Sequence, residues 1–110
     1  MNTSYFAKAG KLPNAISIAR SVPKGWCGRQ CLELAPPWDL LRQFKLDGDQ
    51  DQYTIQYKLL VLDHLDPEAM FKLLGEEAIL LCWEAAGKFC HRRLVAKWLE
   101  EKLKIKIIEL

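Results

Sequence analysis

Thiol, imidazole, carboxylate and guanidinium side chains gather in one short part of this chain. An apolar run ends at Cys82, Glu84 follows two residues later, and Cys90-His91-Arg92 comes shortly after a loop. A thiol beside cationic groups has a lowered pKa and a larger reactive thiolate fraction. Histidine and glutamate transfer protons in suitable surroundings. These residue types predict nucleophilic and acid–base chemistry carried by Cys90, His91, Cys82 and Glu84, with Cys90 as the preferred nucleophile.

The same residues lie where an anion would bind. The pattern predicts a buried strand over 77–82 and a helix over 90–103, so Cys90 and His91 open that helix. The free backbone N–H groups and the positive dipole of a helix start favour an anion. Arg92, together with Arg20 at the end of another predicted strand, adds planar donors suited to phosphate or carboxylate. We therefore expect a phosphorylated or anionic small molecule as the ligand.

Other roles for these side chains stay open. Cysteine is among the most buried residue types, so Cys82 and Cys90 can belong to the core. No export signal accompanies the four cysteines, so we expect reduced thiols rather than a disulfide framework. A zinc site built from Cys27, Cys31, Cys90 and His91, and a redox disulfide between Cys82 and Cys90, are less favoured alternatives. We expect no metal and no bound cofactor.

The predicted elements alternate between strands and helices. Apolar runs, alternation and breakers indicate strands over 3–6, 15–19, 77–82 and 104–110. Helical spacing and helix-start signals indicate helices over 38–45, 51–64, 66–74 and 90–103. Crossover helices between strands require a mainly parallel sheet. We expect one α/β domain over 1–110, a small three-layer domain with about four strands and helices on its faces.

The composition argues against a membrane-spanning or an exported protein. Hydrophobic residues make up 50% and charged residues 27% of the 110 residues, as in ordinary globular proteins. No apolar run reaches the roughly 18 residues that a membrane helix needs, and residues 1–10 lack the apolar core of a signal peptide. We expect a cytoplasmic protein that does not bind a membrane.

The charges are distributed unevenly. Residues 1–45 carry seven basic and two acidic side chains, residues 46–86 two and nine, and residues 87–110 seven and three. The three segments thus have net charges of +5, −7 and +4, which sum to +2. If the two basic ends meet, they favour a phosphate-bearing ligand. The footprint is far weaker than that of a dedicated nucleic-acid binder.

The Cys-x-Glu strand end and the Phe-Cys-His-Arg helix start resemble the signature of domain-of-unknown-function family 488. The similarity continues in Thr3-Ser4-Tyr5-Phe6, in Ile16 to Arg20 and in Leu34-Ala35-Pro36, so it spans almost the whole chain. It implies a compact α/β domain and defines no activity. It also implies that the family's shared positions surround one pocket; here these are Ser4, Tyr5, Arg20, Pro36, Tyr53, Cys82, Glu84, Cys90, His91 and Arg92.

The leading hypothesis is binding, and processing, of a nucleotide or another phosphorylated small molecule. The alternative is a non-catalytic module that sequesters a protein or a nucleic acid. The aperiodic segment 20–37 motivates it, since it contains Trp26, which we expect to be exposed, and the basic Lys24 and Arg29. In a third, structural interpretation, a buried Arg92–Glu84 pair merely fastens the loop to the sheet. A free edge at the closing strand would allow a homodimer as well as a monomer.

Overall fold

The computed structural model describes residues 1–110, and its centre is a parallel five-stranded sheet with the strand order β3-β2-β4-β1-β5. The strands are β1 (Asn2–Tyr5), β2 (Ala15–Ser17), β3 (Arg29–Gln30), β4 (Ile79–Cys82) and β5 (Ile108–Glu109). The α/β class and the parallel sheet are confirmed. The sheet has one strand more than expected, because the two-residue β3 lies in a segment without periodicity. The closing strand β5 is an edge, paired only with β1.

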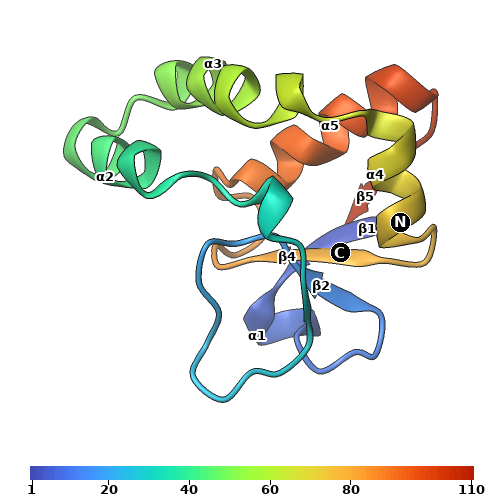
Figure 1. Ribbon diagram of the computed structural model, residues 1–110. Coiled ribbons are helices and arrows are strands. Elements are labelled where there is room, and N and C mark those ends of the chain that lie inside the picture. The colour runs from blue at the N-terminus through green and yellow to red at the C-terminus, as the bar shows by residue number, and fades with distance from the viewer.

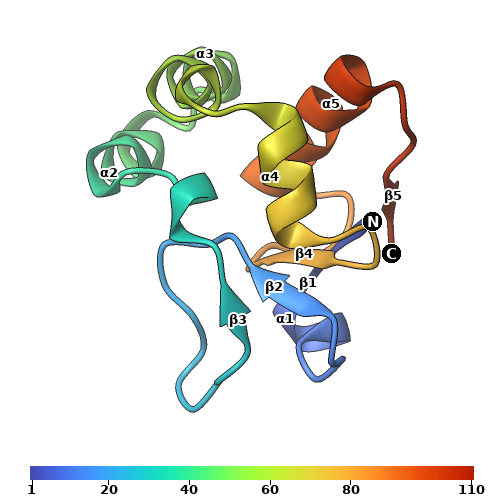
Figure 2. The same ribbon diagram turned by 45° about the vertical axis from the view of Figure 1, so that its right-hand side comes forward.

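Helices cover the two faces of the sheet unequally. The long ones lie on one side, whereas the other side carries the short α1 (Figures 1 and 2). The helices are α1 (Phe6–Ala9), α2 (Trp38–Asp47), α3 (Gln50–Leu60), α4 (Pro67–Leu74) and α5 (His91–Leu103), with 3-10 turns η1 (Leu32–Leu34) and η2 (Leu62–His64). None of these helices is both long and apolar enough to cross a lipid bilayer.

Local sequence signals set several helix boundaries. The Asp49 carboxylate accepts a hydrogen bond from the Gln52 amide and begins α3, and Asp66 caps α4 through the Glu68 amide. Such caps satisfy backbone N–H groups that the first turn leaves free. Gly48 ends α2 in the left-handed conformation, with φ of 62°, which costs glycine little.

The central strand β4 is buried along its whole length. Leu80 belongs to a core cluster of 18 buried residues, which also contains Val95 and Leu99 of α5. Ile79 and Leu81 belong to a smaller cluster of four buried residues with Ala9 and Ala15. Burial on both faces explains why the strand reads as a continuous apolar run rather than as an alternation.

The neighbouring strands β2 and β4 end at the same edge of the sheet, because they run parallel. The chain continues from β2 into Ala19, Arg20 and Ser21, and from β4 into Trp83 and Glu84. Helix α5 then begins close to this edge. Carboxyl ends of parallel strands are the usual ligand sites of open α/β sheets, so the fold brings the predicted site residues toward one place.

The segment 20–37 is more ordered than the sequence predicts, and Trp26 is not an exposed aromatic. The Trp26 side chain is half-buried, donates from Nε1 to the Gly10 carbonyl at 2.8 Å, and packs edge-on against Phe6 with ring centroids 5.3 Å apart. It fastens the loop to α1. The segment also contributes β3 and η1.

Candidate functional site

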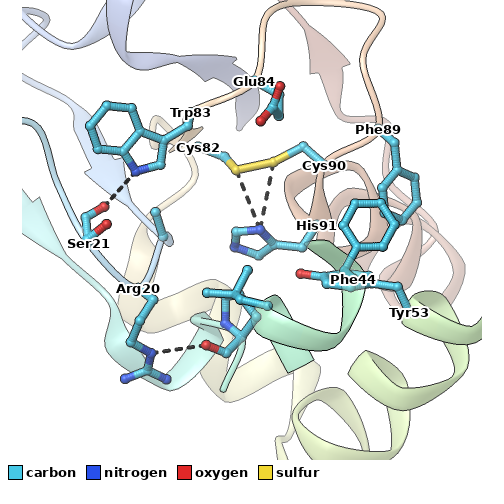
Figure 3. Close-up of a pocket in the computed structure, with 13 residues that line it drawn as sticks. Arg20, Ser21, Phe44, Tyr53, Cys82, Trp83, Glu84, Phe89, Cys90 and His91 are labelled. Carbon is cyan, nitrogen blue, oxygen red and sulfur yellow. Dashed lines mark hydrogen bonds between the residues drawn. A yellow bond between two sulfur atoms is a disulfide. The ribbon is translucent and has the colours of Figure 1, made fainter. Parts of the chain in front are cut away.

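A cavity of about 150 Å³ opens at the carboxyl ends of β2 and β4 (Figure 3). It gathers residues that are far apart in the sequence. Its lining is Ala19, Arg20, Ser21, Pro36, Leu41, Phe44, Tyr53, Cys82, Trp83, Glu84, Phe89, Cys90 and His91. The predicted site residues Arg20, Tyr53, Cys82, Glu84, Cys90 and His91 therefore share one cavity.

Cys82 and Cys90 form a disulfide with an S–S distance of 2.06 Å at one side of this cavity (Figure 3). This corrects the expectation of four reduced thiols: the close approach of the end of β4 to the start of α5 brings the two sulfurs together. Cys27 and Cys31 are free. Cys31 is buried in the core with its sulfur 3.8 Å from that of Met70, so the four zinc ligands considered as a less favoured alternative do not come together.

His91 lies beneath the disulfide and is buried. Its Nε2 donates to the Ile18 carbonyl at 2.6 Å; because a carbonyl oxygen only accepts, Nε2 carries the proton and Nδ1 has a free lone pair. Nδ1 lies 3.5 Å from the Cys82 sulfur and 3.7 Å from the Cys90 sulfur. Burial is the main cause that lowers the pKa of His91 to about 4. The imidazole is therefore neutral near pH 7, where we predicted an acid or base that titrates.

Three aromatic rings form the wall opposite Trp83 (Figure 3). Phe44 of α2, Tyr53 of α3 and Phe89 before α5 are mutual neighbours, with ring centroids 5.1 to 5.4 Å apart. Burial raises the pKa of the Tyr53 hydroxyl, which therefore stays protonated near neutral pH. The wall presents flat apolar surface with one hydrogen-bonding group.

Polar groups lie at the rim. The Arg20 guanidinium donates from Nε to the Pro36 carbonyl at 3.0 Å and from Nη2 to the Ala35 carbonyl at 3.1 Å. These bonds orient the guanidinium and leave Nη1 for another partner. Glu84 is exposed, and the Trp83 indole donates to the Ser21 carbonyl at 2.9 Å. The rim thus offers one cation, one carboxylate and a fixed indole ring.

Arg92, predicted to hold the ligand, does not line the cavity. Its side chain is completely buried and pairs with Glu109 of β5, with Nη2 2.6 Å from a carboxylate oxygen. A second bond runs from Nη2 to the Ala85 carbonyl. The helix register turns this side chain toward the β1–β5 side of the sheet, while Cys90 faces the cavity. The structural interpretation predicted that Arg92 forms a buried ion pair, and this is confirmed. The predicted partner was wrong, because the pair is with Glu109 and not with Glu84.

Ser4 and Tyr5 also lie outside the cavity. Both are in β1, the strand on the far side of β4 from β2. The Ser4 hydroxyl is buried without a hydrogen-bond partner. Tyr5 pairs in register with Cys82, and its ring lies 5.9 Å from the guanidinium carbon of Arg92. Their predicted place in the ligand pocket is therefore not supported by the fold.

One group of side chains has the atoms that a metal ion would need. The sulfurs of Cys82 and Cys90 and the Nδ1 of His91 lie within 4.8 Å of one another. Zinc requires deprotonated thiolates, so only the reduced pair would supply these ligands.

Sequence reasoning did not find Phe44, Phe89, Trp83 and Ser21 as lining residues. Phe89 and Trp83 stand directly beside predicted site residues, and this adjacency was the signal for them. Phe44 gave no such signal, because its place depends on how α2 and α3 pack beside the sheet.

Comparison with known families supports the similarity seen in the sequence. Residues 9–103 match the model of DUF488-N3a, described as the active DUF488-N3 subclade. The chain belongs to this family. No curated protein and no solved structure matches the chain. The DUF488-N3a match covers the cavity and every element around it.

Proposed function

We propose that this DUF488-N3a protein binds a nucleotide or another phosphorylated small molecule in the cavity and processes it with cysteine chemistry. The observation that carries the proposal is the meeting of three kinds of group in one small cavity. An aromatic wall, an oriented guanidinium and a pair of cysteine sulfurs all line it. The family description as an active subclade agrees with a catalytic role.

The aromatic wall fits a flat ring. Pockets that enclose drug-sized ligands measure roughly 300–1,000 Å³, and this cavity of about 150 Å³ is smaller. It admits one ring-sized group and leaves the rest of the ligand outside. Stacking against aromatic side chains contributes about 1–3 kcal/mol per nucleobase, and the Tyr53 hydroxyl supplies one hydrogen bond.

The anionic part of the ligand would lie at the rim. Arg20 keeps Nη1 free while two carbonyls hold the rest of its guanidinium. Helix α5 begins beside the cavity, and no side chain caps its first turn. Uncapped N–H groups at a helix start attract anions. Arg20 and the start of α5 together form the proposed anion site, in which we had also expected Arg92.

The chemistry would use the reduced pair. The Glu84 carboxylate takes the proton of the Cys90 thiol, the thiolate attacks an electrophilic carbon of the ligand, and the new S–C bond forms as the bond to the leaving group breaks. Glu84 then passes the proton to the leaving group. His91 is neutral and buried, so it orients the thiols through Nδ1 instead of exchanging protons with the ligand.

The test is a thermal-shift comparison on the reduced protein with three probes: inorganic phosphate, nucleosides and nucleoside 5′-monophosphates. We expect the monophosphates to raise the melting temperature more than either fragment. Tyr53→Phe should weaken nucleoside binding several-fold, since it removes one hydrogen bond worth about 1 kcal/mol. Arg20→Gln should abolish the advantage of the monophosphate over the nucleoside.

Arg42→Gln is the matched control, because Arg42 is exposed on α2 and does not line the cavity. It should respond like the wild type. Equal responses of Arg20→Gln and Arg42→Gln, or no response to any probe, would contradict the proposal.

A second candidate function, binding of a single-stranded nucleic acid, is supported by a shallow groove of about 800 Å³ on the α1 side. Phe6, Trp26 and Trp83 line it together with Lys11 and Lys24, and its lining contains no acidic residue. Aromatic rings interleaved with cations suit such a strand. Fluorescence anisotropy with a labelled oligonucleotide tests this: Lys11→Glu/Lys24→Glu should abolish binding, whereas Lys102→Glu/Lys106→Glu should not.

A further inference from the structure

We propose that Cys82 and Cys90 are a redox-active pair that undergoes thiol–disulfide exchange with low-molecular-weight thiols entering through the cavity. This activity goes beyond the proposed function and does not require that the cavity bind a nucleotide. It assigns a reaction to the disulfide form of the pair, whereas the proposed function uses only the reduced cysteines.

The disulfide is accessible from the cavity. Each cysteine is only 6% exposed, yet both line the cavity, so a small thiol can reach the sulfurs from this side. Neither residue belongs to the two hydrophobic core clusters. The bond can therefore open without separating core side chains.

The start of helix α5 stabilises the reduced form of the pair. Cys90 is the N-cap residue of the 13-residue helix α5, and no side chain caps that helix. The positive end of the dipole stabilises a thiolate at this position.

The orientation of His91 also favours the reduced form, independently of the helix dipole. Its proton is committed to the Ile18 carbonyl, so the Nδ1 lone pair faces both sulfurs. When the pair is reduced, a thiol S–H can donate to Nδ1. The site thus has a prepared acceptor that the disulfide form does not use.

The exchange proceeds in two steps. An incoming thiolate attacks the Cys90 sulfur, the S–S bond breaks, and Cys82 leaves as a thiolate. A second thiolate attacks the incoming sulfur of the mixed disulfide and releases Cys90. The two cysteines gain two electrons and two protons, and the two small thiols are oxidised to their disulfide.

The experiment uses the Cys27→Ala/Cys31→Ala background, in which only the pair can react. The protein is equilibrated in glutathione buffers of increasing reducing power, quenched with acid, alkylated and weighed by mass spectrometry. We expect one two-electron transition between disulfide and dithiol while circular dichroism shows a folded protein. A pair that stays fully oxidised, or fully reduced, across all buffers would overturn the proposal.

Two variants test the roles of the individual side chains. In Cys82→Ser, oxidised glutathione should form a mixed disulfide on Cys90 that persists because no second thiol resolves it. In the background that keeps both cysteines of the pair, His91→Gln can still donate to Ile18 but lacks the Nδ1 lone pair that accepts from a thiol S–H, so the transition to the dithiol should require more reducing buffers. An unchanged midpoint would remove His91 from the mechanism. No nucleotide is present, so these results stand apart from the thermal-shift test.

Discussion

At the scale of single residues, His91 is the side chain whose environment departs most from that in water. It is buried, donates a hydrogen bond to the Ile18 carbonyl and faces two sulfurs. Its pKa falls from 6.5 to about 4. The unfolded chain therefore binds a proton on His91 at pH values where the folded chain does not.

Stability should consequently fall on acidification. The contribution of neutral His91 is complete above about pH 6.5 and is lost as the pH decreases toward 4, by roughly 3 kcal/mol in total. His91→Gln, which does not titrate, should flatten the dependence of the melting temperature on pH between 7 and 4.5. Glu109 acts at lower pH: burial raises its pKa, but bonds from Arg92 and Thr3 lower it overall. If the melting temperatures of the wild type and of His91→Gln fall in parallel between pH 7 and 4.5, His91 is not the group responsible.

The Arg92–Glu109 pair gives a second prediction at this scale. Arg92 is completely buried, whereas the Glu109 side chain is 20% exposed. Glu109→Ala leaves a buried guanidinium without its counter-charge, and we expect a loss of about 3 kcal/mol in the free energy of unfolding. Arg92→Met keeps most of the volume and removes the charge, so it should cost clearly less. Urea denaturation of both variants measures this, and the reverse order would refute it.

At the scale of elements, α3 carries Tyr53 to the cavity and depends on a local cap. The Asp49 carboxylate accepts a hydrogen bond from the backbone N–H of Gln52, with an N···O distance of 3.0 Å. Asp49→Ala should lower the free energy of unfolding by about 1 kcal/mol. Asp49→Asn keeps an acceptor and should lose much less. Urea denaturation distinguishes the two, and equal losses would show that the cap is not the cause.

Signals within a few residues explain which elements could be predicted from the sequence. The cap at Asp66, the apolar run of β4 and the start of α5 could be predicted because each depends on near neighbours. The cap at Asp49 was not predicted, since the expected helix began at residue 51. Strand β3 was missed because two residues carry no periodicity. The wall formed by Phe44, Tyr53 and Phe89 was missed because it depends on contacts between three separate elements.

At the scale of the whole molecule, strand order decides which predicted residues meet. β2 and β4 are neighbours, so Arg20 joins the cysteines. β1 lies on the other side of β4, so Ser4 and Tyr5 do not. Sequence order could not show this, because β1 and β2 are consecutive in the chain and separated in the sheet. The position of Glu109 beside Arg92 also depends on the closing strand.

The disulfide should contribute to global stability without being required for folding. It closes a short loop, with the cysteines 8 residues apart, for which chain entropy gives roughly 2–3 kcal/mol. The dithiol form should therefore melt several degrees lower, still in one cooperative transition. Calorimetry with and without a reductant checks this. A reduced protein without a cooperative transition would mean that the bond is essential to the fold.

Protection of the thiols by a ligand would show most directly that the cavity binds a nucleotide beside the cysteine pair. The reduced protein is alkylated with iodoacetamide in the presence and absence of a nucleoside monophosphate, and modification is followed residue by residue. We predict that the nucleotide slows alkylation of Cys90 and Cys82 several-fold and leaves the exposed Cys27 unchanged. Unaltered rates at Cys90 and Cys82, with a nucleotide concentration that shifts the melting temperature, would place the ligand elsewhere and contradict the proposed function.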